Sequence, residues 1–223
     1  MQKFDTPTPI TTTLNIPAGR IQFIAADRAD TTVEILPADK SKSRDLKAAE
    51  QTTVTYADGV LRIEAAAAKN RILGNSGSVE VTVQLPAGSR IEAKTAAAEL
   101  RGVGRLGDVT FEAAQATVKL DETTKTHLTL QAGDILVGRL NGPAQISTQK
   151  GDLNVAEATS GTVELRTEFG DITIGAARNT SATLNAGTTY GRIHNTLQNT
   201  TGTNAALTIH ATTAHGDITA HSL

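Results

Sequence analysis

The stretch Leu165-Arg-Thr-Glu-Phe-Gly170-Asp171-Ile-Thr-Ile174 decides the fold of this chain. Apolar and polar residues alternate on both sides of its glycine. Val163 and Leu165 share one face before the glycine, and Ile172 and Ile174 share one face after it. A period of two is typical of β-strands, and a Gly-Asp step between two such runs is typical of a turn. The stretch therefore predicts a strand, a turn and a second strand.

The same pattern recurs in register along the second half of the chain. Four further segments align with it without gaps: Leu128–Val137, Ile146–Val155, Ala186–Asn195 and Ala211–Ala220. A weaker sixth copy is Gly107–Phe111, and the Asp-equivalent positions are 26, 18, 19, 21 and 25 residues apart. Two strands of about five residues with two turns need roughly 20 residues. Because the two end steps are longer, we expect loop insertions at Glu112–Lys125 and Thr196–Asn204.

One such unit cannot bury its apolar face alone, so the repeats must stack to make a continuous core. We predict an all-β fold, a parallel β-solenoid with about two strands per coil and a β-rich N-terminal cap. The boundary is expected near residue 90, with the cap or subdomain at 1–90 and the solenoid at 91–223. One continuous domain over 1–223 is equally compatible with the sequence.

The N-terminal part differs in texture but is still mostly β. Alternating residues predict strands at Ile10–Ile16, Ile21–Ala25 and Thr31–Leu36. Tyr56-Ala-Asp-Gly-Val60 indicates a hairpin. Ser43–Glu50 favours one short helix, with Ser41 or Ser43 as its N-cap, and Lys69–Gly77 has the composition of a loop.

The composition excludes several classes of function. The chain has 223 residues, 3% aromatic residues, no Trp and no Cys, so its core must be built from Val, Ile, Leu, Ala and Thr. The 21 Lys and Arg residues are balanced by 23 Asp and Glu residues. No basic field is available to hold a nucleic-acid backbone or an anionic membrane. The lack of Cys removes disulfides, thiolate chemistry and Cys-type zinc sites.

The ends and the hydropathy of the chain bear on its location. Met1–Pro7 contains no apolar segment of the kind found in secretory signals. No apolar run approaches the roughly 20 residues that span a bilayer. We therefore expect a cytoplasmic protein that does not insert into membranes.

The glycines and aspartates of the repeat are the most conspicuous candidate site. We interpret them as turn residues, in which Gly supplies a positive φ and Asp binds its own turn backbone. The alternative is a ladder of Asp134, Asp152 and Asp171 that holds a hard cation such as Ca²⁺, so that EDTA would lower the melting temperature. Arg192 replaces Asp in one copy, favours the turn interpretation, and could pair with Asp171 or Asp217. The predicted turn residues are Gly107, Asp108, Gly133, Asp134, Gly151, Asp152, Gly170, Asp171, Gly191, Gly216 and Asp217.

Other motifs give weaker signals. Of the late histidines His194, His210, His215 and His221, we expect His194 and His215 to occupy nearly corresponding, exposed places in adjacent coils. Gly102–Gly107 fits G-x-G-x-x-G, but a strand-like segment follows it where a dinucleotide site needs a helix. No nucleophile elbow is present. The sequence therefore predicts no catalytic residue, no metal site and no cofactor.

Several segments resemble a known family, the bacterial β-strand-repeat proteins labelled "putative adhesins", and among these the soluble actinobacterial type. The resemblance covers nearly the whole chain. It rests on the serial Gly-Asp-Ile/Val/Leu steps and on Phe4–Pro7, Ala48–Thr52, Val81–Gly88, Tyr190–Asn195 and His215–Ile218. It implies a β-solenoid of unknown function, and no catalytic residues carry over.

We therefore expect a non-enzymatic scaffold or binding module for a protein or glycan partner. The last coil, which ends at Ala220–Leu223, is expected to expose a strand edge through which the chain forms an oligomer such as an end-to-end dimer. Two alternatives stay open. One is a carbohydrate-acting β-helix enzyme, which would need a concave groove with Asp or Glu near Lys or Arg. The other is a structural solenoid stabilised by cations.

Overall fold

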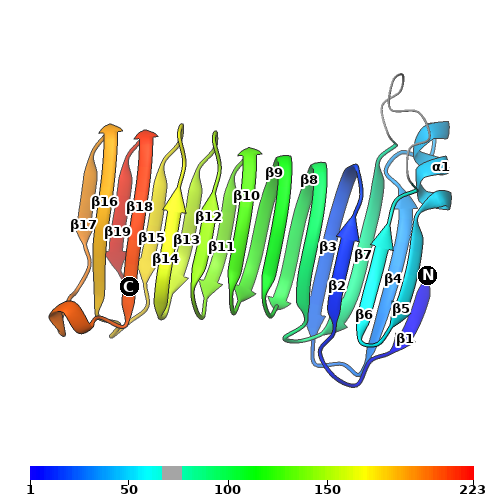
Figure 1. Ribbon diagram of the computed structural model, residues 1–223, viewed down its shortest axis with the longest axis horizontal. Coiled ribbons are helices and arrows are strands. Elements are labelled where there is room, and N and C mark those ends of the chain that lie inside the picture. Colours follow the sequence, from blue (N-terminus) through cyan, green and yellow to red (C-terminus); the bar gives the residue numbers. More distant parts are fainter. Residues whose placement is uncertain (67–76) are drawn as a thin grey trace.

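The computed structural model describes residues 1–66 and 77–223, and shows a long stack of flattened β-coils (Figure 1). Each coil places one strand in a first ladder and one in a second ladder, and the two long strands β8 (Arg90–Arg105) and β9 (Val109–Thr123) run through both. Pairing between coils is parallel. The structure confirms an all-β fold with a large, mostly parallel sheet. No helix among the described residues is long and apolar enough to cross a membrane.

The first ladder contains ten strands in spatial order. They are β5 (Thr53–Ala57), β6 (Val60–Glu64), β2 (Thr11–Asn15), the first part of β8, the first part of β9, β10 (Thr126–Ala132), β12 (Ala144–Ser147), β14 (Gly161–Arg166), β18 (Leu207–His215) and β16 (Ala182–Tyr190).

The second ladder is made in the same way. It runs through β1 (Gln2–Asp5), β4 (Asp30–Pro37), β7 (Val79–Pro86), β3 (Ala18–Ala26), the second part of β8, the second part of β9, β11 (Ile135–Leu140), β13 (Leu153–Ala158), β15 (Ile172–Ala176), β19 (Ile218–Ser222) and β17 (Ile193–Thr196).

The core lies between the two ladders and consists of rows of stacked aliphatic side chains. In each strand alternate residues point inward, and each inward side chain packs on its equivalent in the next coil, about 4.8 Å away. Burying one such Leu or Ile side chain contributes about 1.5–3 kcal/mol. One buried row consists of Val118, Ile135, Leu153, Ile172 and Ile218.

The N-terminal end of the stack is closed by antiparallel strands and a helix. β4 is antiparallel to β7, β1 to β4, and β5 to β6. The β5–β6 connection confirms the predicted hairpin, because Asp58 and Gly59 have φ of 51° and 74°, as a two-residue turn of this hand requires. Helix α1 (Ser43–Gln51) is seen at this end beside β4 (Figure 1).

The predicted helix is confirmed, but its predicted N-cap is wrong. The N-cap is Lys42, which makes no side-chain capping hydrogen bond. Ser41 lies in the preceding turn, where its hydroxyl donates to Asp39 Oδ1 at 2.6 Å. The buried residue of the helix is Asp45, whose Oδ1 accepts the backbone N–H of Ser78 at 3.0 Å. A carboxylate therefore ties the helix to the start of β7.

The order of coils in space differs from their order in the sequence at both ends. The β2–β3 coil is inserted between the β6–β7 coil and β8. At the other end the β18–β19 coil, which is last in the sequence, is inserted between the β14–β15 coil and the β16–β17 coil. The terminal coil of the stack is therefore β16–β17, which corrects the prediction that the coil ending at Leu223 is exposed.

The predicted loop insertions have different outcomes. The insertion at Glu112–Lys125 is wrong, because most of this segment belongs to β9, which passes from the first ladder to the second without a break. The insertion near Thr196–Asn204 is confirmed, since residues 197–206 connect β17 to β18 and contain the short 3-10 helix Gly202–Asn204. All but the last residue of the predicted loop Lys69–Gly77 lies outside the described residues. The domain boundary at residue 90 stays a prediction.

Candidate functional site

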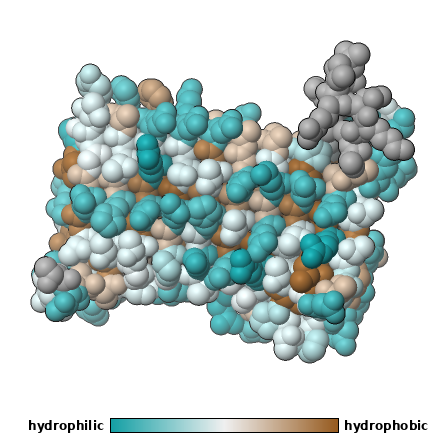
Figure 2. Space-filling view, in the orientation of Figure 1, coloured by the Kyte–Doolittle hydropathy of each residue, from teal (hydrophilic) through white to brown (hydrophobic). Residues whose placement is uncertain are grey.

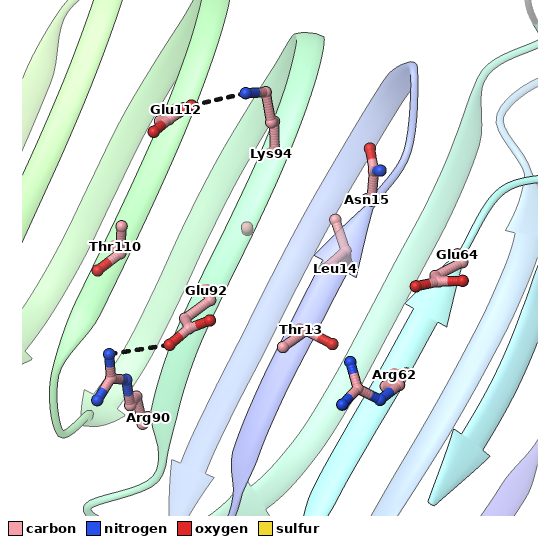
Figure 3. Close-up of a pocket in the computed structure, with 11 residues that line it drawn as sticks. Thr13, Leu14, Asn15, Arg62, Glu64, Arg90, Glu92, Lys94, Thr110 and Glu112 are labelled. Carbon is pink, nitrogen blue, oxygen red and sulfur yellow. Dashed lines mark hydrogen bonds and ion pairs between the residues drawn. The ribbon is translucent and has the colours of Figure 1, made fainter.

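A groove crosses the outer face of the first ladder near its N-terminal end, with a volume of about 500 Å³ (Figure 3). Its floor is β2, which presents the short side chains Thr13 and Asn15. Its walls are the longer charged side chains of β6 on one side and of β8 and β9 on the other: Arg62, Glu64, Arg90, Glu92, Lys94 and Glu112. The groove exists because an inserted strand with small outward residues lies between strands with long ones.

The strand register places charges of opposite sign across the floor. Thr13 lies opposite Arg62 on β6 and Glu92 on β8. Asn15, two residues further, lies opposite Glu64 and Lys94. The two walls are separated by two strand spacings, which is about 9.5 Å. The groove is therefore wide enough for a single extended chain and carries no excess of either charge.

Some of the wall charges are already paired. Arg90 Nη2 lies 2.9 Å from Glu92 Oε1, and Lys94 Nζ lies 2.9 Å from Glu112 Oε2. The hydrogen bond from Lys94 lowers the pKa of Glu112 below its usual value. A general acid needs the opposite shift, because it must hold its proton near neutral pH. Glu112 is therefore held as a carboxylate.

Other polar groups in the groove are free to bind a ligand. Over residues 1–66 and 77–223, the side chains of Asn15, Arg62 and Glu64 form no hydrogen bond or ion pair. The hydroxyl oxygen of Thr13 is buried and also has no partner. Figure 3 shows the guanidinium of Arg62 pointing toward Thr13. The floor and one wall thus offer donors and acceptors that the protein itself leaves unused.

The Gly-Asp residues form a second feature, a ladder along the edge where the first ladder of strands passes into the second. Each Asp accepts the backbone N–H of the equivalent residue in the next coil. Asp134 Oδ1 accepts from Asp152 N at 2.9 Å, Asp152 from Asp171 at 2.8 Å, and Asp171 from Asp217 at 2.7 Å. The predicted partner was the turn's own backbone, so the structure replaces a contact within one turn by a contact between coils.

The glycines make room for these carboxylates. A Cβ on Gly170 would lie 2.9 Å from Asp152 Oδ1 and 2.0 Å from the carbonyl oxygen of Gly151. Gly151, Gly170 and Gly216 also have φ between 145° and 151°, in the region that favours glycine. The Gly-Asp pair recurs because the glycine of one coil leaves space for the aspartate of the coil before it.

The ladder ends at Arg192, which stacks outside Asp217. Arg192 N donates to Asp217 Oδ1 at 2.8 Å and its Nη2 lies 2.6 Å from Oδ2. This hydrogen bond lowers the pKa of Asp217. The pairing with Asp217 is one of the two that the sequence suggested. Over residues 1–66 and 77–223, no three His, Cys, Asp or Glu side chains come together in a way that could hold a metal ion.

Gly107 and Asp108 do not belong to this ladder, contrary to the sequence alignment. Asp108 precedes Val109, which pairs with Ile91 and Thr126 at the starts of neighbouring coils. Gly107 N donates to Ser89 O at 2.9 Å. This step therefore lies on the opposite edge of the stack. At the Gly-Asp edge β9 carries Ala116 and Thr117, which continue the strand through the corner.

The late histidines also differ from expectation. His194 lies opposite Thr219, whereas His215 lies opposite Tyr190, so the two do not correspond. The ring of His215 is instead stacked between Phe169 and Tyr190, with centroids 4.8 and 4.9 Å apart. Phe169 and Tyr190 are 52% and 68% exposed. Sequence analysis missed this short aromatic row, since the three residues come together only through the inserted coil.

Comparison with known proteins was made on the whole chain. The family model described as Toastrack DUF4097 matches residues 11–221. The chain belongs to the Toastrack DUF4097 family. The predicted resemblance to "putative adhesins" of unknown function is thereby confirmed.

Solved structures similar to this Toastrack chain carry related descriptions. A "putative adhesin" from Bacteroides fragilis is 15% identical, with a TM-score of 0.59 over 100% of this chain and 95% of that one. A "putative cell adhesion protein" from Clostridium sporogenes is 12% identical, with a TM-score of 0.41 over 100% and 98% of the two chains. No curated protein matches the chain. At these identities the first likeness supports the Toastrack fold.

The Asp ladder of this Toastrack chain can be tested by two substitutions at one position. Asp152→Asn is expected to leave the free energy of unfolding unchanged or raise it, because the amide oxygen still accepts the N–H of Asp171 and one stacked charge is removed. Asp152→Ala loses the acceptor and is expected to cost about 0.5–1.5 kcal/mol. Urea denaturation measures both. At Asp108, which lies outside the ladder, Asn and Ala should have equal effects. An Asn variant as unstable as the Ala variant at position 152 would contradict the ladder.

Proposed function

We propose that this chain is a non-enzymatic binding module whose groove over β2 binds a neutral oligosaccharide. One observation carries the proposal: the unused donors and acceptors of Thr13, Asn15, Arg62 and Glu64 line one continuous groove. Sugar hydroxyls both donate and accept hydrogen bonds, so they match a surface that offers both kinds of group. The balance of charge in the groove favours a neutral chain over a phosphorylated or sulfated one.

The absence of aromatic residues from the groove limits the affinity. Its lining contains no Phe, Tyr or Trp, so binding rests on hydrogen bonds and on contact with the stems of the Arg and Lys side chains. Net hydrogen bonds in water contribute about 0.5–1.5 kcal/mol each. We therefore expect dissociation constants on the order of 0.1–1 mM for a short oligosaccharide, with stronger apparent binding when many copies are displayed together.

The alternative, a carbohydrate-acting enzyme, is favoured by one feature. The groove holds Glu64, Glu92 and Glu112 within a surface that also carries Arg and Lys. A glycosidase needs one carboxyl group that keeps its proton. Glu112 has the opposite tendency, and Glu92 is paired with Arg90. These contacts support a groove that binds without catalysis.

A panel of neutral, anionic and cationic oligosaccharides tests both functions at once. Binding is measured by saturation-transfer NMR and titration calorimetry, and release of reducing ends is followed in the same samples. Neutral oligosaccharides are expected to bind and to remain intact. Asn15→Ala should weaken binding about tenfold, the equivalent of one hydrogen bond, and Thr13→Gln should abolish it by filling the floor.

Arg139→Ala provides the matched control, because Arg139 is an exposed arginine of the second ladder that is paired with Glu157 at 2.9 Å. This variant should bind as the unmodified chain does. Equal binding by the Thr13 variant, or no binding by any neutral sugar, would contradict the proposal. Release of reducing ends would establish the enzymatic alternative.

A further inference from the structure

The terminal coil of the stack leaves two strand edges open at once. Within the part of the chain that the structure describes, β16 pairs only with β18 and β17 only with β19. The two strands lie together at one end of the molecule, opposite the helix (Figure 1). An open edge presents a row of N–H and C=O groups to any strand that can pair with it.

The direction of the free groups on β16 follows from its bonds to β18. Leu207 N donates to Ser181 O, so in a parallel ladder the odd-numbered residues from Ser181 face β18. Ala182 faces away from it, and its N–H is bonded to Gln198 O at 3.0 Å in the following loop. The next outward residues are Leu184 and Ala186, and no residue in 1–66 or 77–223 accepts their N–H groups.

The aliphatic core also ends in the open at this coil. Ile193 is 46% exposed, whereas its equivalents in the next two coils, Ile218 and Ile172, are 0% exposed. Leu184 is likewise only partly buried. Covering these last inward side chains would add apolar burial to the hydrogen bonds that a partner makes with the edge.

The edge carries few of the residues that normally protect such strands. Between Ala182 and Thr196 the charged residue is Arg192, and its guanidinium is engaged with Asp217. No Lys, Glu, Asp or Pro interrupts this segment. Edge strands are commonly protected by charges, Pro or bulges. At the other end of the stack, by comparison, β1 contains Lys3 and Asp5, and the neighbouring strands are antiparallel.

We propose that a second copy of this chain covers the open end and forms a closed two-fold dimer. A two-fold axis perpendicular to the ladders would pair β16 with β16 of the partner subunit, and β17 with its counterpart, both antiparallel. Strands of nine and four residues then meet strands of equal length. An extended peptide could cover only one of the two edges. The mismatch with the short strands β1 and β5 disfavours growth into a filament.

Sedimentation equilibrium of the full chain tests this dimer. The chain is expected to be dimeric at high micromolar concentration. Ala186→Pro removes an outward N–H at a strand edge, where Pro is tolerated, and Ile193→Lys places a charge on the apolar end. Each is expected to raise the dissociation constant of the dimer at least tenfold. Gln145→Lys adds the same charge at an exposed position in the middle of the first ladder and should leave the dimer intact.

Circular dichroism establishes that the variants are folded, and hydrogen exchange gives an independent measurement. The amides of Leu184 and Ala186 should exchange more slowly as the concentration of the unmodified chain rises. If Ala186→Pro does not fold, Ile193→Lys and the exchange data decide. A monomer up to about 0.5 mM, which corresponds to less than about 5 kcal/mol of association, would overturn the proposal. Open-ended polymers, or dimers that both variants leave unchanged, would also overturn it.

Discussion

Gly170→Ala is expected to destabilise the protein by about 3–5 kcal/mol, the range of the most damaging single substitutions. The added Cβ would lie 2.0 Å from the carbonyl oxygen of Gly151 and 2.6 Å from its carbonyl carbon. Its backbone φ of 151° is in addition unfavourable for alanine. The clash is with backbone, which cannot rotate away as a side chain could.

The neighbouring coil is also held in place by its own bonds. Gly151 N donates to Phe169 O at 2.9 Å, and Gly151 O accepts the hydroxyl of Thr167 at 3.1 Å. Relief of the clash would break these bonds, and the shift would pass to the next Gly-Asp step. The cost is therefore larger than that of the strained φ alone.

Gly187 supplies the matched control. A Cβ on Gly187 meets no atom within 4 Å, and the residue lies in β16 of the terminal coil. Gly187→Ala is expected to change stability by less than about 1 kcal/mol, with a gain as reasonable as a loss. Urea denaturation of both variants measures the difference. Equal effects at the two positions would show that the Gly-Asp corner is not tightly packed.

The repeat made the architecture predictable because it reports a physical requirement of each coil. In-register stacking demands the same inward residues at the same positions, and Ile135, Leu153 and Ile172 are indeed opposite one another. Even Arg192 was correctly aligned, since Ile193 pairs with Ile218. A gapless alignment of five segments thus contained the register of much of the second ladder.

The same reasoning failed where a motif has two structural uses. Gly107-Asp108 resembles the other steps, but it turns the chain at the opposite edge. Nothing within five residues distinguishes the two edges. The informative signal was the 26-residue step to Asp134, which is a complete coil plus part of the next and not a coil with a loop.

The candidate groove was not predictable, although part of its chemistry was visible. Charges alternate with other residues in Arg62-Ile-Glu64 and in Arg90-Ile-Glu-Ala-Lys94, which indicates polar outer faces. The groove itself depends on β2 lying between those strands. That neighbour relation skips tens of residues and leaves no periodic trace in one sequence.

The inserted coil at the C-terminal end gives the second large prediction. Ile209 is completely buried in β18, opposite Val163 on one side and Leu184 on the other. Ile209→Asp would bury an unpaired carboxylate, at a cost of several kcal/mol. Because each coil contacts only its neighbours, we expect the damage to spread outward and not through the whole stack.

The expected pattern is set by the order of coils in space. Ile209→Asp should release both 207–222 and 182–196, because the outer coil is attached through the inserted one. Leu184→Asp should release 182–196 alone, and coils between β10 and β15 should stay folded in both variants. Hydrogen exchange followed by mass spectrometry reads each segment separately. If the coils were stacked in sequence order, the result would be reversed: Leu184→Asp would release both segments and Ile209→Asp only the last. The pair of variants therefore decides which coil stands at the end, and with it which edge is open to a partner.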